Sequence, residues 1–201
     1  MFATNRASCW RQLFAAACAA LLLGACTNEP MFTATDITGA TFGQDFRLFD
    51  PDGRTRSLAD FRGKAVLVFF GFTQCPDVCP TALIRAAEVK RLLGADAGRL
   101  QVVFVTLDPE RDTPAVLREY TAAFGADVLG LYTTVENTAR VAEEFRIFYR
   151  KVPTGDSYTM DHTATSYVYD PAGRLRLAVL HAQGAEALAA DLKTLLQSFS
   201  R

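Results

Sequence analysis

The sequence has almost no net charge, no internal repeat and no low-complexity segment. Its 21 Lys and Arg residues stand against 22 Asp and Glu residues, so the formal net charge is −1. Proteins that hold nucleic acid neutralise its phosphates with clustered basic residues, and nothing in this balance suggests such a partner. The apolar run at residues 13–23 is shorter than the roughly 20 residues that a membrane-spanning helix needs.

The start of the chain has the features of an export signal. Two arginines, Arg6 and Arg11, precede the apolar run, which ends in a Leu-Gly-Ala-Cys sequence whose last residue is Cys26. This ending resembles the lipobox of bacterial lipoproteins, in which small residues precede a cysteine that becomes lipidated. We therefore predict a lipoprotein signal peptide over residues 1–25 and a lipid on Cys26 that holds the protein to a membrane. An ordinary signal peptide and an uncleaved anchor helix are the alternatives. Each of the three places the domain outside the cytoplasm, in the periplasm or another extracytoplasmic space.

Tryptophan and free cysteine are scarce once this signal is excluded. The single tryptophan, Trp10, lies in it together with Cys9 and Cys18. Since Cys26 is expected to carry lipid, two free thiols remain, those of Cys75 and Cys79. No other cysteine competes to pair with them, so a disulfide between the two can form in an oxidising compartment.

The rest of the chain is long enough for one domain. Removal of residues 1–25 leaves 176 of the 201 residues, enough for a substantial core. Residues 26–41 are polar, without a clear periodicity, and we predict that they form a tether or linker to the membrane. Residues 42–201 are predicted to form a single domain.

The two cysteines lie where a strand is predicted to turn into a helix. The run at 65–72 is apolar throughout, which is typical of a fully buried strand. The segment 80–93 predicts a helix with Pro80 at its first position and Gly94 just past its end. A helix N-terminus stabilises thiolates. A dithiol at this place can exchange with disulfides or bind a soft metal ion.

Strands and helices are predicted to alternate through the rest of the domain. An order of βαβαβαββα with buried parallel strands indicates an α/β sandwich, and the terminal hairpin and helix give it the appearance of a thioredoxin fold. The predicted elements are strands at 46–50 and 55–58 around a turn, a strand at 100–107, a helix at 114–124 after a Thr113 cap, a strand at 128–131, a helix at 135–149, a polar loop at 152–161, strands at 163–169 and 175–180 around a turn at 170–173, and a final helix with Leu188, Leu192, Leu195, Leu196 and Phe199 on one face.

Three motifs in this order resemble the Sco/SenC family. They are GFTQCPDVCP at 71–80, DPERDTP at 108–114, and Asp161-His162-Thr163 followed by DPAG at 170–173. Members of this family are membrane-tethered, thioredoxin-like proteins that help to assemble the copper A centre of cytochrome c oxidase. The resemblance implies a thioredoxin-like three-layer α/β sandwich with an N-terminal β-hairpin extension. It also implies a copper site made by Cys75, Cys79 and His162.

The chemistry of these three residues agrees with a copper site. Two thiolates and an imidazole form a soft ligand set that suits Cu(I) and can also hold Cu(II). His162 comes before a strand expected to lie beside the cysteine-bearing strand, where thioredoxins place a cis-proline. No proline occurs between Pro153 and Pro171. A metal ligand in the place of the proline that holds a thioredoxin substrate favours metal binding over disulfide exchange.

Two functions follow as hypotheses. The first is a copper metallochaperone, not an enzyme, that delivers copper to the copper A subunit of cytochrome c oxidase, with a copper donor chaperone and a thiol reductant as further partners. The alternative is a thiol–disulfide reductase in which Cys75 and Cys79 are the redox-active dithiol and keep the cysteines of the oxidase copper site reduced. A peroxidase fits poorly, because Phe72 stands where peroxiredoxins have threonine.

Other polar residues near the motifs keep more than one interpretation. Asp161 can hydrogen-bond the histidine ring, contact a partner or start a strand. Asp77 is expected in solvent, since a carboxylate is a hard ligand. His181 follows a strand without any motif around it. The segment 108–114 either contacts the copper loop or a partner, or simply caps a helix.

Overall fold

The structure, a computed structural model, describes residues 30–199 of the chain. The folded domain begins at Phe32. Every helix and strand that the structure describes belongs to this domain. Within residues 30–199, no helix has both the length and the apolar character needed to cross a membrane. The predicted signal peptide and Cys26 lie outside the described residues.

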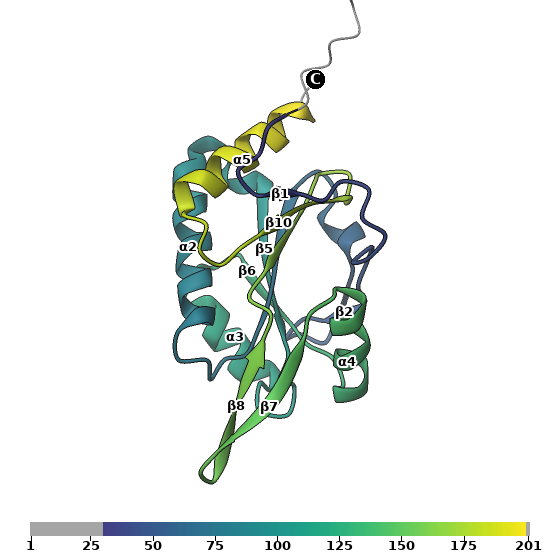
Figure 1. Ribbon diagram of the computed structural model, residues 1–201, viewed down its shortest axis with the longest axis vertical. Helices are drawn as coiled ribbons and strands as arrows, with labels where there is room; N and C mark the ends of the chain where they lie inside the picture. The colour runs from purple at the N-terminus through teal and green to yellow at the C-terminus, as the bar shows by residue number, and fades with distance from the viewer. Residues whose placement is uncertain (1–29, 200–201) are drawn as a thin grey trace, which may run out of the picture. The chain divides into compact units, whose positions relative to one another are not determined.

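The centre of the domain is a six-stranded mixed sheet (Figure 1). β4 (Ala65–Gly71), β5 (Leu100–Thr106) and β6 (Val128–Leu131) run parallel to one another, whereas β9 (Ser166–Tyr169) runs antiparallel to β4, and β10 (Leu175–Val179) runs antiparallel to β9. Every residue of β4 is buried, as expected for an apolar strand in a sheet covered on both faces. The predicted strands at 65–72 and 100–107 are confirmed, and β9 lies beside the cysteine-bearing strand as predicted. In order across the sheet the strands are β1 (Thr35–Asp36), β10 (Leu175–Val179), β9 (Ser166–Tyr169), β4 (Ala65–Gly71), β5 (Leu100–Thr106) and β6 (Val128–Leu131).

Helices cover both faces of this sheet and complete three layers (Figure 1). α2 (Val78–Leu93), α3 (Pro114–Ala122) and α5 (Ala185–Ser198) lie on one face, and α4 (Val135–Glu144) lies on the other. Four leucines of α5 are fully buried, and each buried leucine contributes about 1.5–3 kcal/mol. The predicted thioredoxin-like sandwich is therefore confirmed. Two short 3-10 helices, η1 (Leu58–Phe61) and η2 (Gly94–Arg99), connect the layers.

An N-terminal hairpin precedes the first central strand, as predicted. It consists of β2 (Leu48–Phe49) and β3 (Thr55–Arg56), which pair with each other in a separate sheet. The buried Asp50 stabilises its turn by accepting hydrogen bonds from the backbone N–H groups of Asp52 and Arg54.

The folded domain begins earlier than residue 42. β1 lies within the segment 26–41, which the sequence suggests is a tether, and it pairs antiparallel with β10 at the edge of the central sheet. The backbone N–H groups of Thr33 and Ala34 donate to the buried carboxylate of Asp191 on α5. These contacts place residues from Phe32 onward in the domain.

The segment after α4 differs most from the sequence-based prediction. The helix predicted at 135–149 ends at Glu144, because Arg146 adopts a left-handed backbone conformation with φ 53°. The predicted polar loop at 152–161 is instead a hairpin of β7 (Tyr149–Thr154) and β8 (Ser157–His162). Gly155, with φ 57°, allows its tight two-residue turn. The hairpin extends beyond the end of the central sheet (Figure 1) and ends at His162.

The start of α2 also differs from the prediction in a way that affects the cysteines. The helix begins at Val78, so Pro80 is its third residue and not its first. Proline is tolerated there because the first four N–H groups of a helix have no partner within it. The other predicted helix start is confirmed: Thr113 caps α3, its side chain accepting from the N–H of Val116, with Pro114 as the first helical residue.

Candidate metal centre

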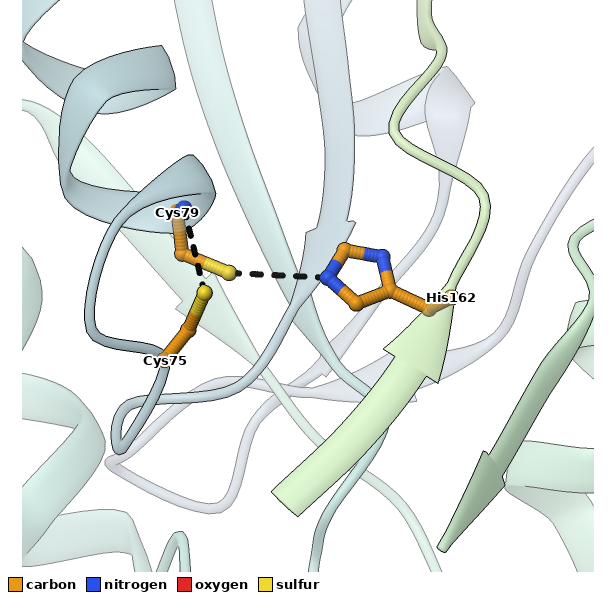
Figure 2. A group of neighbouring side chains, drawn as sticks. All are labelled: Cys75, Cys79 and His162. Atoms are coloured by element: carbon orange, nitrogen blue, oxygen red, sulfur yellow. Dashed lines mark hydrogen bonds between the residues drawn. The ribbon is translucent and has the colours of Figure 1, made fainter. Parts of the chain in front are cut away.

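The cysteines lie where β4 turns into α2, one in the connecting loop and one in the first turn of the helix (Figure 2). Cys75 belongs to the loop and is half-buried, whereas Cys79 is the second residue of α2 and is fully buried. The N–H of Cys79 is one of those without a partner in the helix, and it donates to the Cys75 sulfur over 3.4 Å. The early start of α2 thus holds the Cys75 sulfur at the helix N-terminus.

The last residue of β4, Gly71, makes room for the Cys79 sulfur. A Cβ atom at Gly71 would lie 2.7 Å from the Cys79 Sγ and 2.9 Å from Cε2 of Phe104. Real Cβ atoms essentially never approach other atoms so closely. The sulfur therefore occupies the space that any other residue at this position would need.

His162, the last residue of β8, faces the cysteines from the opposite side (Figure 2). Its Nε2 lies 3.7 Å from the Cys79 Sγ. Its Nδ1 lies 2.9 Å from the carbonyl oxygen of Thr163. A carbonyl can only accept a hydrogen bond, so Nδ1 carries the proton and Nε2 of the neutral ring presents a lone pair to the sulfurs. The rings of Phe69 and Phe72 pack edge-on against the imidazole.

Together the three residues form a group that can hold a metal ion. The two sulfurs and one ring nitrogen lie within 4.8 Å of one another. Thiolate and imidazole donors suit soft and borderline metals such as copper. The hydrogen bond from His162 to Thr163 resembles the outer contacts that orient metal-bound histidines. The donor set and the ring orientation thus fit a copper ion.

The two thiols differ in acidity. The hydrogen bond from the Cys79 thiol lowers the pKa of Cys75 to about 5, and the N–H groups of Asp77 and Cys79 act in the same direction, against partial burial. The same hydrogen bond, then burial, raises the pKa of Cys79. At neutral pH the reduced pair therefore holds one thiolate, on Cys75. Binding of a metal ion by both sulfurs releases the proton of Cys79.

The other candidate residues lie outside this group, which is the only such cluster of His, Cys, Asp and Glu found among residues 30–199. Asp77 is exposed, as predicted, and its carboxylate accepts from Thr81. Asp161 pairs with Arg150 over 2.8 Å at the surface and does not hold the histidine ring in place. The carbonyl oxygen of His181 accepts from Arg85 of α2.

The segment 108–114 does contact the cysteine loop. The buried carboxylate of Asp112 accepts from the N–H and hydroxyl of Thr73, at 3.0 and 2.6 Å, and from the hydroxyl of Thr106. Burial raises the pKa of Asp112. Arg111 donates to the side chain of Gln74, which precedes Cys75. The segment therefore contacts the cysteine loop, and it also caps a helix, because its Thr113 caps α3. The sequence had suggested these two roles as alternatives.

Sequence comparison gives matches over most of this domain. The family described as SCO1/SenC matches residues 34–197. The mitochondrial SCO2 homologue of Bos taurus is 38% identical over 165 residues, which is 80% of this chain and 62% of that protein. The SCO2-like protein of Rickettsia felis is 36% identical over 135 residues, 66% of each. This chain thus spans less than two thirds of the bovine protein's length.

Solved structures of similar proteins share the fold. Bradyrhizobium japonicum ScoI with copper bound is 41% identical, with a TM-score of 0.70, over 78% of this chain and 99% of that chain. Yeast Sco1 with copper bound is 30% identical, with a TM-score of 0.71, over 79% of this chain and 90% of that chain. Copper-bound structures thus occur among the proteins that this chain resembles.

Proposed function

Because this chain belongs to the SCO1/SenC family, we propose that it is a copper chaperone that binds one copper ion through Cys75, Cys79 and His162. The observation that carries the proposal is the orientation of His162. Its Nδ1 donates a hydrogen bond to the Thr163 carbonyl, so its Nε2 is free to face the two sulfurs. The nitrogen and the two sulfurs lie within 4.8 Å of one another, close enough to bind a single metal ion. A reductase needs the two thiols alone, whereas this nitrogen supplies a third ligand to a copper ion and has no role in disulfide exchange.

The exposure of the site suits delivery of a metal ion to another protein. Cys79 is buried, while Cys75 and His162 are half-buried. A ligand of an acceptor can therefore approach the ion from the side of these two residues while Cys79 still holds it. The acceptor that we propose is the copper A subunit of cytochrome c oxidase, with a copper donor protein and a thiol reductant acting before delivery.

A second function, thiol–disulfide reduction, has one observation in its favour. The pKa of Cys75, about 5, makes this sulfur a thiolate at neutral pH, and the thiolate is the species that attacks disulfides. Cys79, within reach of the same sulfur, would then resolve the mixed disulfide. Both functions use the same reduced pair, and His162 separates them.

The proposed location is outside the cytoplasm, with a lipid on Cys26 as the anchor. This proposal depends on the sequence of residues 1–26 alone. The relatives include a mitochondrial protein of Bos taurus. An extracytoplasmic domain would meet the oxidase on the side of the membrane where this chain is tethered.

Copper titrations of the pre-reduced protein test the proposed site, with Cu(I) in the presence of reductant and with Cu(II) after the reductant has been removed. We expect one copper ion per wild-type chain and a loss of affinity of at least about 10–100-fold in His162→Ala, since even partners of metal ligands are worth that much. The matched control is His181→Ala, which removes the other histidine of the chain and leaves the ligand group intact. Equal affinity of wild type and His162→Ala for both Cu(I) and Cu(II) would show that the imidazole is not a ligand.

A further inference from the structure

A cluster of three side chains connects the segment 108–114 to the hairpin that carries His162. We call it the clamp, and it consists of Asp108, Arg111 and Tyr158. Nε of Arg111 donates to one carboxylate oxygen of Asp108 over 2.5 Å, and the Tyr158 hydroxyl donates to the other over 2.8 Å. The Arg111 guanidinium also lies over the Tyr158 ring, 3.6 Å from its centroid. Each member of the clamp thus contacts both others.

Arg111 contacts both segments that supply metal ligands. Its Nη1 donates to the side chain of Gln74, next to Cys75, over 3.1 Å. The same Nη1 donates to the carbonyl oxygen of Tyr158, in the strand that ends at His162, over 2.8 Å. One guanidinium therefore bridges the cysteine loop and β8.

Burial makes these contacts strong. The Asp108 side chain is 0% exposed and that of Arg111 is 16% exposed. A desolvated, hydrogen-bonded ion pair is costly to break, because its loss leaves an uncompensated charge in the interior. By contrast, the two charged pairs at the surface beside the clamp, Arg150–Asp161 and Lys151–Glu110, are each about half exposed and worth little. The clamp is therefore the strongest polar link between the hairpin and the cysteine loop among these contacts.

The hairpin is held to the rest of the domain by side-chain contacts and not by strand pairing. β7 and β8 form a separate two-stranded sheet, which is not hydrogen-bonded to the central sheet. An isolated two-stranded hairpin is marginally stable by itself. Of the residues in β7 and β8, Met160 is the one that is fully buried. The position of His162 relative to the sulfurs consequently depends on side-chain contacts, namely the buried Met160, the rings of Phe69 and Phe72 against the imidazole, and the clamp.

We propose that the clamp of Asp108, Arg111 and Tyr158 is the positioning device that holds His162 against the dithiol and so determines whether bound copper gains its nitrogen ligand. This proposal rests on the proposed copper site. The cysteine pair is a soft ligand set that suits Cu(I) by itself, whereas Cu(II) prefers nitrogen and oxygen donors. Weakening the clamp should therefore reduce Cu(II) affinity more than Cu(I) affinity. By holding His162 against the dithiol, Asp108 and Arg111 of the segment 108–114 increase the affinity of the site for Cu(II) relative to Cu(I).

The test uses two clamp variants and a matched control. Tyr158→Phe keeps the ring and removes the hydroxyl that donates to Asp108, and Arg111→Gln removes the charge and the bridge. Arg150→Gln removes a charge from the same hairpin at a site that pairs only with surface-exposed Asp161. Circular dichroism and thermal melting establish whether each variant is folded. If Arg111→Gln does not fold, Tyr158→Phe alone tests the proposal.

We expect the clamp variants to lose about 10–100-fold in Cu(II) affinity, the range found for partners that orient metal ligands, with a smaller loss for Cu(I). The nitrogen hyperfine splitting in the Cu(II) electron paramagnetic resonance spectrum should weaken, and Arg150→Gln should match wild type. Folded clamp variants with wild-type Cu(II) affinity and spectrum would overturn the proposal.

A metal-free measurement separates this proposal from the proposed function. Amide hydrogen exchange of residues 157–163 in the copper-free, reduced protein should accelerate in both clamp variants and stay at the wild-type rate in Arg150→Gln. If the wild-type chain failed to bind copper, the copper site would be refuted while faster exchange would still support positioning by the clamp. Unchanged exchange in both folded clamp variants would refute the clamp itself, whatever the chain binds.

Discussion

Replacing Gly71 with alanine should damage the metal site more than it damages the fold. The added Cβ would lie 2.7 Å from the Cys79 Sγ, whereas ordinary contacts begin at 3.4 Å, so the sulfur must move by about 0.7 Å. Metal–ligand distances tolerate only about 0.2 Å. Overpacking of a core position costs about 1–3 kcal/mol in stability. The displacement therefore exceeds what a bound copper ion accepts, while the energetic cost leaves the domain folded.

The control for this experiment is Gly130→Ala in β6. A Cβ at Gly130 would lie 2.5 Å from Cγ of Leu117, so this variant is also overpacked in the sheet, but against a leucine and not a sulfur. Thermal melting of both variants gives the cost to the fold, at about 2–4 °C for each kcal/mol in a domain of this size. Copper titration and the sulfur-to-Cu(II) charge-transfer band give the cost to the site.

We expect similar losses in melting temperature for the two variants. Gly71→Ala alone should shift the charge-transfer band and lower copper affinity. If Gly71→Ala kept the wild-type band and affinity, the reasoning that places the Cys79 sulfur at the end of β4 would be refuted.

Three further predictions concern the cysteines. In the reduced, copper-free protein, alkylation of Cys75 should be half-maximal near pH 5, because the reactive thiolate forms as the pH rises through the pKa of Cys75. Cys79 should resist alkylation through pH 9, because its pKa is raised. Half-maximal reaction of Cys75 near the ordinary pKa of a thiol would contradict this prediction. Oxidation of the pair to a disulfide should abolish Cu(I) binding, and reduction should restore one site per chain; tight binding to a verified disulfide form would place the ligands elsewhere. Mass spectrometry of the protein from membranes should find a lipid on an N-terminal Cys26, and a mature chain that retained Arg6 would exclude the lipoprotein signal.

Local sequence signals were sufficient for most of the central sheet. β4 is an unbroken apolar run and every one of its residues is buried. β5 is mostly apolar and buried, with the half-buried Gln101 as its one residue that is not fully covered, as expected for strands covered on both faces. Thr113 before Pro114 correctly predicted a capped helix start. These features depend on neighbouring residues, so they can be recognised in one sequence.

The hairpin of β7 and β8 could not be recognised in the same way. Its strands pair with each other and not with the central sheet, so most of their residues are exposed or half-buried, and polar residues outnumber apolar ones over 149–162. Apolar residues at 145–149 continued the pattern of α4, although Arg146 ends that helix in a left-handed conformation. The two-residue turn at Gly155 and Asp156 was the available signal.

The ligand residues were predicted by motif, but the contacts that orient them were not. The position of the Cys79 sulfur over Gly71, and the links from Arg111 to Gln74 and to Tyr158, join residues distant in the sequence. No spacing in the sequence indicates such contacts. They depend on the strand order of the sheet and on the position of the hairpin.

X-ray absorption spectroscopy of the copper-loaded, reduced protein measures the proposed ligand set itself. We expect one copper ion per chain with two sulfur neighbours from Cys75 and Cys79 and one nitrogen neighbour from His162. In His162→Ala the nitrogen shell with its imidazole scattering should disappear while the two sulfurs remain. A wild-type spectrum without sulfur neighbours would exclude the cysteines as ligands, and an imidazole signal that persists in His162→Ala would exclude His162.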